Sequence, residues 1–159
     1  MSLKIDVIYH DGEIVAYRNQ SALSSACSSG KPTLIRALKT PIEFRFCNTA
    51  NTPETIIAQE NFSHAQILLS CRDRLLSCCE EGIVLFTDED GFQTLRIEKL
   101  NIDTPDVRSL LADSYLDLET CRHGLAECEL SIAIYSSSDE RSVQLFFTMD
   151  VIIKNAILA

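Results

Sequence analysis

Apolar residues recur at every second position through much of the chain, and this period is typical of half-buried β-strands. Between Lys4 and Tyr9 the alternating apolar residues are Ile5, Val7 and Tyr9 itself. Pro41–Cys47 repeats the pattern, with apolar side chains on one face and a Glu and an Arg on the other. Both segments are therefore predicted to be strands that turn one face toward a hydrophobic core.

Two short turn sequences predict β-hairpins. Asp11-Gly12 separates the first strand from a second one at Glu13–Arg18, and glycine accepts the positive φ that a tight hairpin turn requires. The acidic turn 88–91 joins Gly82–Thr87 to Phe92–Leu100 in the same way. We therefore expect two antiparallel hairpins, and residues 1–20 could form an arm that is separable from the rest of the chain.

The remaining segments contain strands, loops and one ambiguous run. Thr33–Lys39 is short and apolar, so its pattern does not decide between strand and helix. Ser21–Lys31 and Asn48–Glu54 have the composition of loops, and Arg72–Glu81 is a polar link that could hold a helical turn. Further strands are predicted at His64–Cys71, Tyr115–Leu118, Glu129–Tyr135 and Arg141–Ile153, the last of which could carry a bulge.

One helix start is clearly marked. Thr104 can cap a helix, and Pro105 suits the first helical position because its missing N–H is not needed there. These residues predict a helix at Pro105–Ala112, and Thr120 could cap a helical turn that runs through Glu127. About eight to ten strands at spacings of about 8–12 residues indicate one all-β domain over residues 1–159. The expected architecture is an antiparallel, immunoglobulin-like β-sandwich with one or two short helices, with a barrel as the alternative.

Charge and hydropathy exclude several classes of function. The 159 residues carry a formal net charge of −9, from 23 acids and 14 bases. Such a surface repels phosphate backbones and anionic membranes, so we expect no nucleic-acid partner. The apolar runs are far shorter than the roughly 18 residues of a membrane-spanning helix, so no membrane insertion is expected. The amino terminus lacks the pattern of a secretory signal, which predicts a protein made in the cytoplasm.

Seven cysteines and three histidines are the residues that metal or nucleophilic chemistry would use. An odd cysteine count without a secretory signal favours reduced, mostly buried thiols, with a disulfide framework as the alternative. Cys121, His123 and Cys128 lie close in sequence, but the second ligand pair of a structural zinc site is missing. A cysteine nucleophile beside His64 or His123 would lack a glycine-rich turn. The remaining cysteines and histidine are Cys27, Cys47, Cys71, Cys78, Cys79 and His10.

The acidic turn 88–91 is the remaining candidate for cation binding. An EF-hand loop that starts at Asp88 would need Glu at its twelfth position, where Lys99 stands. The chain has five glycines and no phosphate-binding loop motif, and it lacks tryptophan, a common residue for stacking on sugars. The sequence therefore predicts a protein that is not an enzyme and has no catalytic, cofactor-binding or metal-binding residues.

Residues from Tyr115 to Leu158 run through a strand that ends in Thr, a helical link, a second strand, and a final strand that ends near Asn155. This order resembles the closing half of the β-sandwich in bacteriophage tail and baseplate proteins, and is similar to the amino-terminal domain of baseplate upper proteins. Pro41–Cys47 and His64–Cys71 resemble early strands of that family, although the acidic residue expected after the Asn is absent. The resemblance implies an oligomeric structural or attachment component without an enzymatic site.

These patterns predict an assembly module that docks through edge strands and loops onto copies of itself or a neighbouring protein subunit. A phage or prophage tail or baseplate component, carried in the virion, is the specific form of this prediction. The alternative is a module that binds a ligand or glycan on its loops. An enzyme with Cys/His or carboxylate chemistry is a third hypothesis, and a pocket with a histidine beside a cysteine would favour it.

Overall fold

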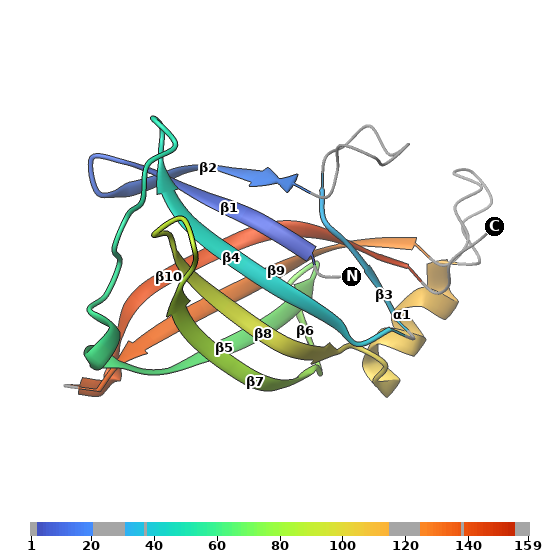
Figure 1. The fold of residues 1–159 in the computed structure, drawn as a ribbon. Helices are drawn as coiled ribbons and strands as arrows, with labels where there is room; N and C mark the ends of the chain where they lie inside the picture. Colours follow the sequence, from blue (N-terminus) through green and yellow to red (C-terminus); the bar gives the residue numbers. More distant parts are fainter. Residues whose placement is uncertain (1–2, 21–30, 37, 115–124, 138, 155–159) are drawn as a thin grey trace.

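The computed structural model describes residues 3–20, 31–36, 38–114, 125–137 and 139–154 (Figure 1). These residues form ten strands, one α-helix and a short 3₁₀ turn. The strands are β1 Leu3–His10, β2 Glu13–Asn19, β3 Thr33–Ile35, β4 Thr40–Asn48, β5 Phe62–Cys71, β6 Arg74–Leu76, β7 Cys79–Thr87, β8 Gln93–Asn101, β9 Leu125–Ser136 and β10 Asp139–Lys154. The 3₁₀ turn is η2 Gln59–Asn61, and the α-helix is α1 Pro105–Ser114.

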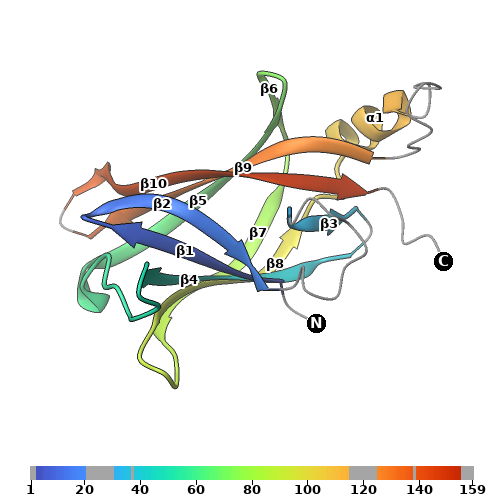
Figure 2. The ribbon, with the colours of Figure 1, turned by 90° about the horizontal axis from the view of Figure 1, so that it is seen from above.

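The strands form two mixed five-stranded sheets, which lie one over the other (Figure 2). Sheet A has the order β2-β1-β4-β8-β7, and sheet B has the order β3-β10-β9-β5-β6. The pairs β1–β4 and β3–β10 are parallel, and the other neighbouring pairs are antiparallel. The all-β prediction is confirmed, but the sheets are mixed, so the predicted antiparallel, immunoglobulin-like sandwich is not confirmed.

The parallel pair in sheet A arises because the chain leaves this sheet and returns to it. After the β1–β2 hairpin the chain passes through β3 in sheet B, and β4 then joins the other side of β1 in the same direction. An alternating sequence fixes which face of a strand is buried, but it does not fix the direction of the neighbouring strand. The sequence therefore could not reveal the mixed sheets.

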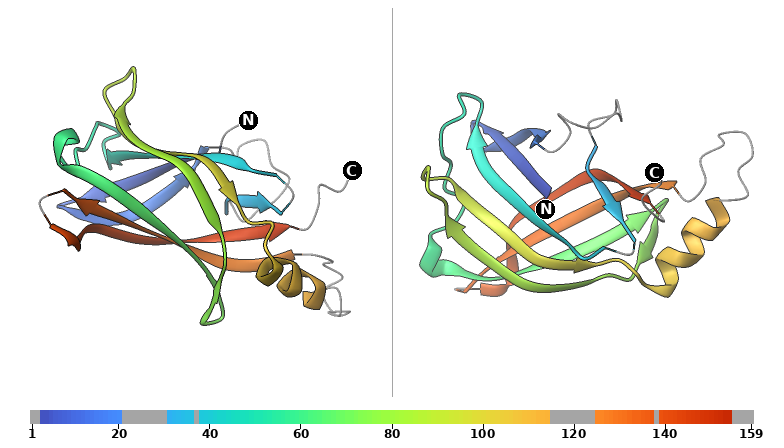
Figure 3. Two further views of the ribbon diagram at one scale, coloured as in Figure 1. Left: turned by 90° about the horizontal axis from the view of Figure 1, so that it is seen from below. Right: turned by 45° about the vertical axis from the view of Figure 1, so that its right-hand side comes forward.

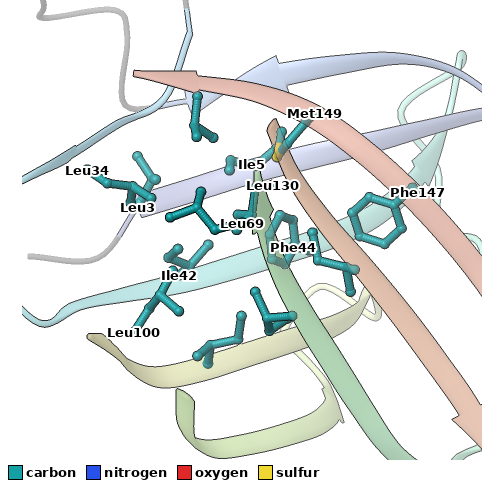
Figure 4. Packing of buried hydrophobic residues seen from close by; sticks show 14 of the residues in the cluster. Leu3, Ile5, Leu34, Ile42, Phe44, Leu69, Leu100, Leu130, Phe147 and Met149 are labelled. Atoms are coloured by element: carbon teal, nitrogen blue, oxygen red, sulfur yellow. The ribbon is translucent and has the colours of Figure 1, made fainter. Parts of the chain in front are cut away.

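The core lies between the two sheets and takes side chains from both. On β4 the three apolar residues that alternate with Glu43 and Arg45 are fully buried, as the sequence predicts. Phe147 of β10 meets Phe44 of β4 edge-on, with ring centroids 5.4 Å apart and an interplanar angle of 75°. Figure 4 shows this pair between strands of opposite sheets. Strand β1, between β2 and β4, contributes four buried residues to the same core: Leu3, Ile5, Val7 and Tyr9.

Several predicted elements are confirmed in detail. Asp11 and Gly12 have φ of 53° and 80° and form the tight turn of the β1–β2 hairpin. Thr104 caps α1 by accepting a hydrogen bond from the N–H of Val107 at 3.4 Å. The helix lies at one end of the two sheets (Figure 3). The bulge expected in the last strand is present near Val143, where the register of β10 against β9 shifts.

Two helical predictions are wrong. The link at 72–81 contains no helical turn: Arg72 and Asp73, with φ of 50° and 65°, form a tight turn from β5 into β6, and β7 begins at Cys79. Arginine and aspartate give a weak sequence signal for this turn, because glycine is the usual residue at positive φ. The helical turn predicted to run through Glu127 is also wrong at its end, because residues 125–127 belong to β9.

Some predictions fall on residues that the structure does not describe. The predicted strand at Tyr115–Leu118, the helix start at Thr120 and residues 21–30 of the predicted loop lie outside the described residues. The ambiguous run at 33–39 contains the short strand β3.

Replacing Gly82 of β7 with alanine is expected to lower the free energy of unfolding by about 2 kcal/mol. Gly82 has a φ of 69°, and a Cβ there would lie 2.8 Å from the Cβ of Glu98 on β8. Gly12→Ala is the matched control, because its φ is 80° but nothing lies within 4 Å of the added carbon. Chemical denaturation of both variants should show the larger loss for Gly82→Ala. Equal losses would mean that β7 moves away from β8 at little cost.

Candidate functional site

The described histidines lie on the surface, away from any catalytic arrangement that the sequence suggests. His64 of β5 stacks on Tyr135 of β9, with ring centroids 4.5 Å apart and an interplanar angle of 5°. Its Nδ1 lies 3.0 Å from the hydroxyl of Ser63. His10 is exposed at the end of β1, 3.4 Å from Asp11. His123 lies outside the described residues.

The described cysteines are free thiols, and several have an environment that opposes nucleophilic chemistry. Burial raises the pKa of Cys47, raises that of Cys78 to about 11, and raises that of Cys128 to about 12. A cysteine nucleophile needs the reverse, because only the thiolate attacks. Cys71 is buried as well, whereas Cys79 is exposed; Cys27 and Cys121 lie outside the described residues.

The acidic turn between β7 and β8 uses its first carboxylate to hold the turn. Oδ1 of Asp88 accepts hydrogen bonds from the N–H groups of Asp90 at 3.0 Å and Phe92 at 2.8 Å. This is the local side-chain-to-backbone bonding by which aspartate stabilises turns. Among the described residues, no group of three or more His, Cys, Asp or Glu side chains could hold a metal ion.

Asp6 forms the centre of a polar network on the outer face of sheet A. Its carboxylate is only 1% exposed and accepts hydrogen bonds from Arg18 Nε at 2.8 Å, Arg45 Nε at 2.9 Å and Gln20 Nε2 at 2.8 Å. The guanidinium of Arg45 also lies 4.2 Å from the ring centroid of Phe92. Burial by itself would raise the pKa of Asp6, but the hydrogen bonds from Arg45, Gln20 and Arg18 outweigh it and hold the pKa below its ordinary value.

Acidification is expected to destabilise the protein partly through Asp6. Because its pKa in the folded state lies below the ordinary value of 3.8, its contribution to stability is complete above that value. The contribution is then lost as the pH falls through the folded-state pKa. Free energies of unfolding measured across this acid range should show a steeper decline for the native chain than for Asp6→Asn. Parallel declines would contradict the assigned role of Asp6.

A groove of about 370 Å³ opens beside this network. Five acids and two bases line it, together with Gln20, Phe86 and Thr94. Arg45 is already bonded to Asp6, and the first acid of the β7–β8 turn is bonded to backbone. Pockets for small molecules are usually lined by apolar side chains with a few polar groups, so this groove has an unusual lining for such a role.

The outer face of sheet B carries several exposed apolar side chains. On β5 and β10 these are Phe146, Val143 and Leu68, which are 56%, 45% and 36% exposed, and Leu75 of the edge strand β6 is 64% exposed. Phe146 lies beside Ala133 in the sheet register, and Val143 lies beside Tyr135. We call this surface the aromatic face and define it by five residues: His64, Leu68, Tyr135, Val143 and Phe146. Exposed apolar side chains gathered on one face of a domain are typical of interaction sites.

The aromatic face has an acidic border. Glu129 of β9 lies directly opposite Asp150 of β10, and both side chains are exposed. Like charges opposite each other across a strand pair destabilise the sheet. Neither side chain forms an ion pair with a described base. A basic group from outside would relieve this repulsion.

The edges of the two sheets are poorly suited to pairing with another strand. In sheet B both edge strands, β3 and β6, have three residues. In sheet A, β2 carries a bulge near Val15, and β7 contains two acids and the left-handed Gly82. Short, bulged and charged edges are the usual protection against edge-to-edge pairing. The sequence-based expectation of docking through edge strands therefore finds little support in this geometry.

The sequence does not reveal the aromatic face, because a single exposed phenylalanine has no local signature. The pair Phe146-Phe147 lies in a long apolar run, and the bulge near Val143 decides which of the two points outward. The sequence points to His64 of this face only as a possible catalytic group. The sequence does not reveal the Asp6 network either, because its four members come from positions 6, 18, 20 and 45.

Comparisons with known proteins add no family to this picture. No protein-family model and no curated protein matches the sequence. In the part of the chain that the structure describes, no helix is long and apolar enough to cross a membrane.

Proposed function

We propose that this chain is a non-enzymatic assembly module that attaches to another protein subunit through the aromatic face of sheet B. The observation that carries the proposal is the exposure of Phe146, Val143 and Leu68 on one outer face. Aromatic side chains with neighbouring aliphatic ones are the usual energetic centre of protein interfaces. The protected edges support attachment by a sheet face rather than by strand addition.

Charge indicates the chemistry of the partner. The chain carries a net charge of −9, and Glu129 and Asp150 border the aromatic face without a counter-ion among the described residues. A second copy would bring a further acidic surface to the same place, and like-charge contacts at an interface are costly. We therefore assign the face to a different protein, one that presents an apolar surface with Lys or Arg beside it.

The setting that we propose is a phage or prophage tail or baseplate assembly. Support comes from the resemblance of residues 41–158 to domains of such proteins, together with an all-β chain that has exposed apolar side chains on one sheet face. The immunoglobulin-like topology is part of the same proposal. Tail or baseplate genes beside the gene for this chain would support this setting, and a neighbourhood without them would count against it.

A ligand-binding role is the second candidate, and the groove on sheet A is the observation that favours it. Its volume of about 370 Å³ would admit a small molecule. The charged groups that could orient a ligand are, however, largely bonded to one another or to backbone. This candidate therefore ranks below the assembly role.

Photo-crosslinking in the cells that make the protein tests the assembly role. A photoreactive phenylalanine analogue at position 146 of the full chain is expected to give an adduct with one other protein. The matched control has the analogue at the exposed Ala16 on β2 of sheet A, and should not give that adduct. The identified protein, once purified, should bind the unmodified chain, more weakly as salt is added.

Three outcomes would count against the proposal. An adduct only from position 16, or from neither position, overturns the assignment of the aromatic face. An adduct between two copies of the chain overturns the choice of a different partner. Binding to the purified partner that salt does not weaken overturns the role of the acidic border.

A further inference from the structure

Two cysteines on neighbouring strands of sheet B face each other inside the core. The register pairs Leu69 with Leu130 and Ser70 with Glu129, so the next pair along β5 and β9 is Cys71 with Cys128. Both side chains are buried, with exposed fractions of 7% for Cys71 and 3% for Cys128. They therefore point to the same inner face of the sheet, as alternation requires.

The Cys71 thiol also reaches across to the strand that carries Cys128. The thiol of Cys71 donates a hydrogen bond to the backbone oxygen of Glu127 at 3.3 Å, which places its sulfur beside the strand that carries Cys128. Residues directly opposite in an antiparallel pair have Cα atoms about 4.5–5.5 Å apart. Disulfides span Cα separations of about 4.4–6.8 Å, so the backbone needs little movement for a bond to close.

We propose that Cys71 and Cys128 form an oxidisable pair, which hydrogen peroxide converts into a disulfide that fastens β5 to β9. Cys71 takes the oxidant, because it precedes the exposed turn at Arg72 and Asp73 and is the less buried of the two. Cys128 then resolves the oxidised sulfur, because it lies opposite on the next strand. The proposal concerns the sheet itself and does not depend on the assembly role.

The chemistry balances with one peroxide for each pair of thiols. The sulfur of Cys71 attacks a peroxide oxygen: an S–O bond forms, the O–O bond breaks, and the thiol proton leaves with the second oxygen as water. The sulfur of Cys128 then attacks the sulfenic sulfur of Cys71. The S–S bond forms, the S–O bond breaks, and hydroxide leaves with the proton of Cys128 as a second water. Two thiols are oxidised by two electrons, and the peroxide is reduced to two waters.

Burial and the neighbouring Cys71 thiol raise the pKa of Cys128 to about 12. The thiolate is the reactive form of a cysteine, so the resolving attack by Cys128 should be slow at neutral pH and faster in alkaline solution. The exposed Cys79 will react with peroxide as well, and its products must be distinguished from the proposed bond.

Peptide mapping without reduction is the test. The full chain is treated with hydrogen peroxide, free thiols are alkylated, and trypsin then releases residues 46–72 with Cys71 and residues 123–141 with Cys128. We expect these two peptides to be joined. The mass of the joined peptide should be two hydrogens less than the sum of the two peptide masses, and reduction should separate them. Disulfides stabilise folded proteins, so the midpoint of thermal unfolding should rise on the order of 5 °C.

Residues 46–72 also contain Cys47, so fragmentation of the joined peptide must place the bond at Cys71. The variant Cys47→Ala provides a second check, because it should still form the bond. Free, alkylatable Cys71 and Cys128 after Cys79 has been fully oxidised would overturn the proposal. A bond that fragmentation places at Cys47 would overturn it as well.

Discussion

Replacing Phe147 with alanine is expected to lower the free energy of unfolding by about 4 kcal/mol. Phe147 is 3% exposed and meets Phe44 and Phe46 edge-on, with centroids 5.4 and 6.2 Å away. Its ring thus joins β10 of sheet B to β4 of sheet A. Truncation removes buried apolar area and leaves a cavity between two sheets that cannot collapse freely.

The neighbouring residue gives a matched control for this prediction. Phe146 has the same side chain on the same strand, but it is 56% exposed on the aromatic face. Phe146→Ala should change the free energy of unfolding by no more than about 0.5 kcal/mol. Chemical denaturation of both variants makes the comparison. Similar losses for the two would contradict the assigned directions of these side chains and the bulge that sets them.

Replacing Asp6 with alanine is expected to cost about 4 kcal/mol of unfolding free energy at neutral pH. The carboxylate is buried and holds two guanidinium groups, so its removal leaves Arg18 and Arg45 facing each other without the charge between them. The cost arises mainly at Arg45, which is only 23% exposed and stays partly desolvated without its carboxylate, whereas Arg18 is 50% exposed. The loss should appear as a lower denaturation midpoint.

Two further variants separate this effect from a general effect of lost charge. Asp150→Ala on the exposed border of the aromatic face should change stability by no more than about 0.5 kcal/mol, since it also removes the repulsion with Glu129. The double variant Asp6→Ala with Arg45→Ala should lose less unfolding free energy than the two single variants lose together, because the two residues interact directly. Additive losses would show that the network contributes little.

The sequence determines much of the fold, since local patterns carry the relevant physics. Alternation locates the buried faces of β1 and β4, and the turn at Asp11-Gly12 marks the first hairpin. The cap at Thr104 marks the start of α1. Each of these features depends on residues that lie close together in the chain, and each is confirmed.

Features that depend on distant residues could not be predicted in this way. The parallel pairing of β4 with β1 depends on the path of the intervening chain. The pairing of Cys71 with Cys128 depends on the register of two strands that are far apart in sequence. Asp6 is one of 23 acids, and only the folded sheet shows that Arg18 and Arg45 converge on it.

The candidate site likewise depends on residues that are distant in the sequence, so it could not be predicted from local patterns. Sequence patterns direct attention to cysteines, histidines and the acidic turn, because these residue types carry known chemistry. The folded chain uses Asp88 to hold its turn and stacks His64 on a tyrosine. The aromatic face is instead made by ordinary residues on three strands, and their common feature is exposure on one side of a sheet.

The dissociation constant of the complex with the protein crosslinked at position 146 tests the central claim most directly. Isothermal titration of the native chain and of Phe146→Ala against this purified partner gives the two constants. An aromatic anchor at the centre of an interface contributes about 2 kcal/mol or more, so the variant should bind at least roughly 30-fold more weakly while its stability is unchanged. Binding by Phe146→Ala that is as tight as that of the native chain would contradict the assignment of the aromatic face as the docking surface.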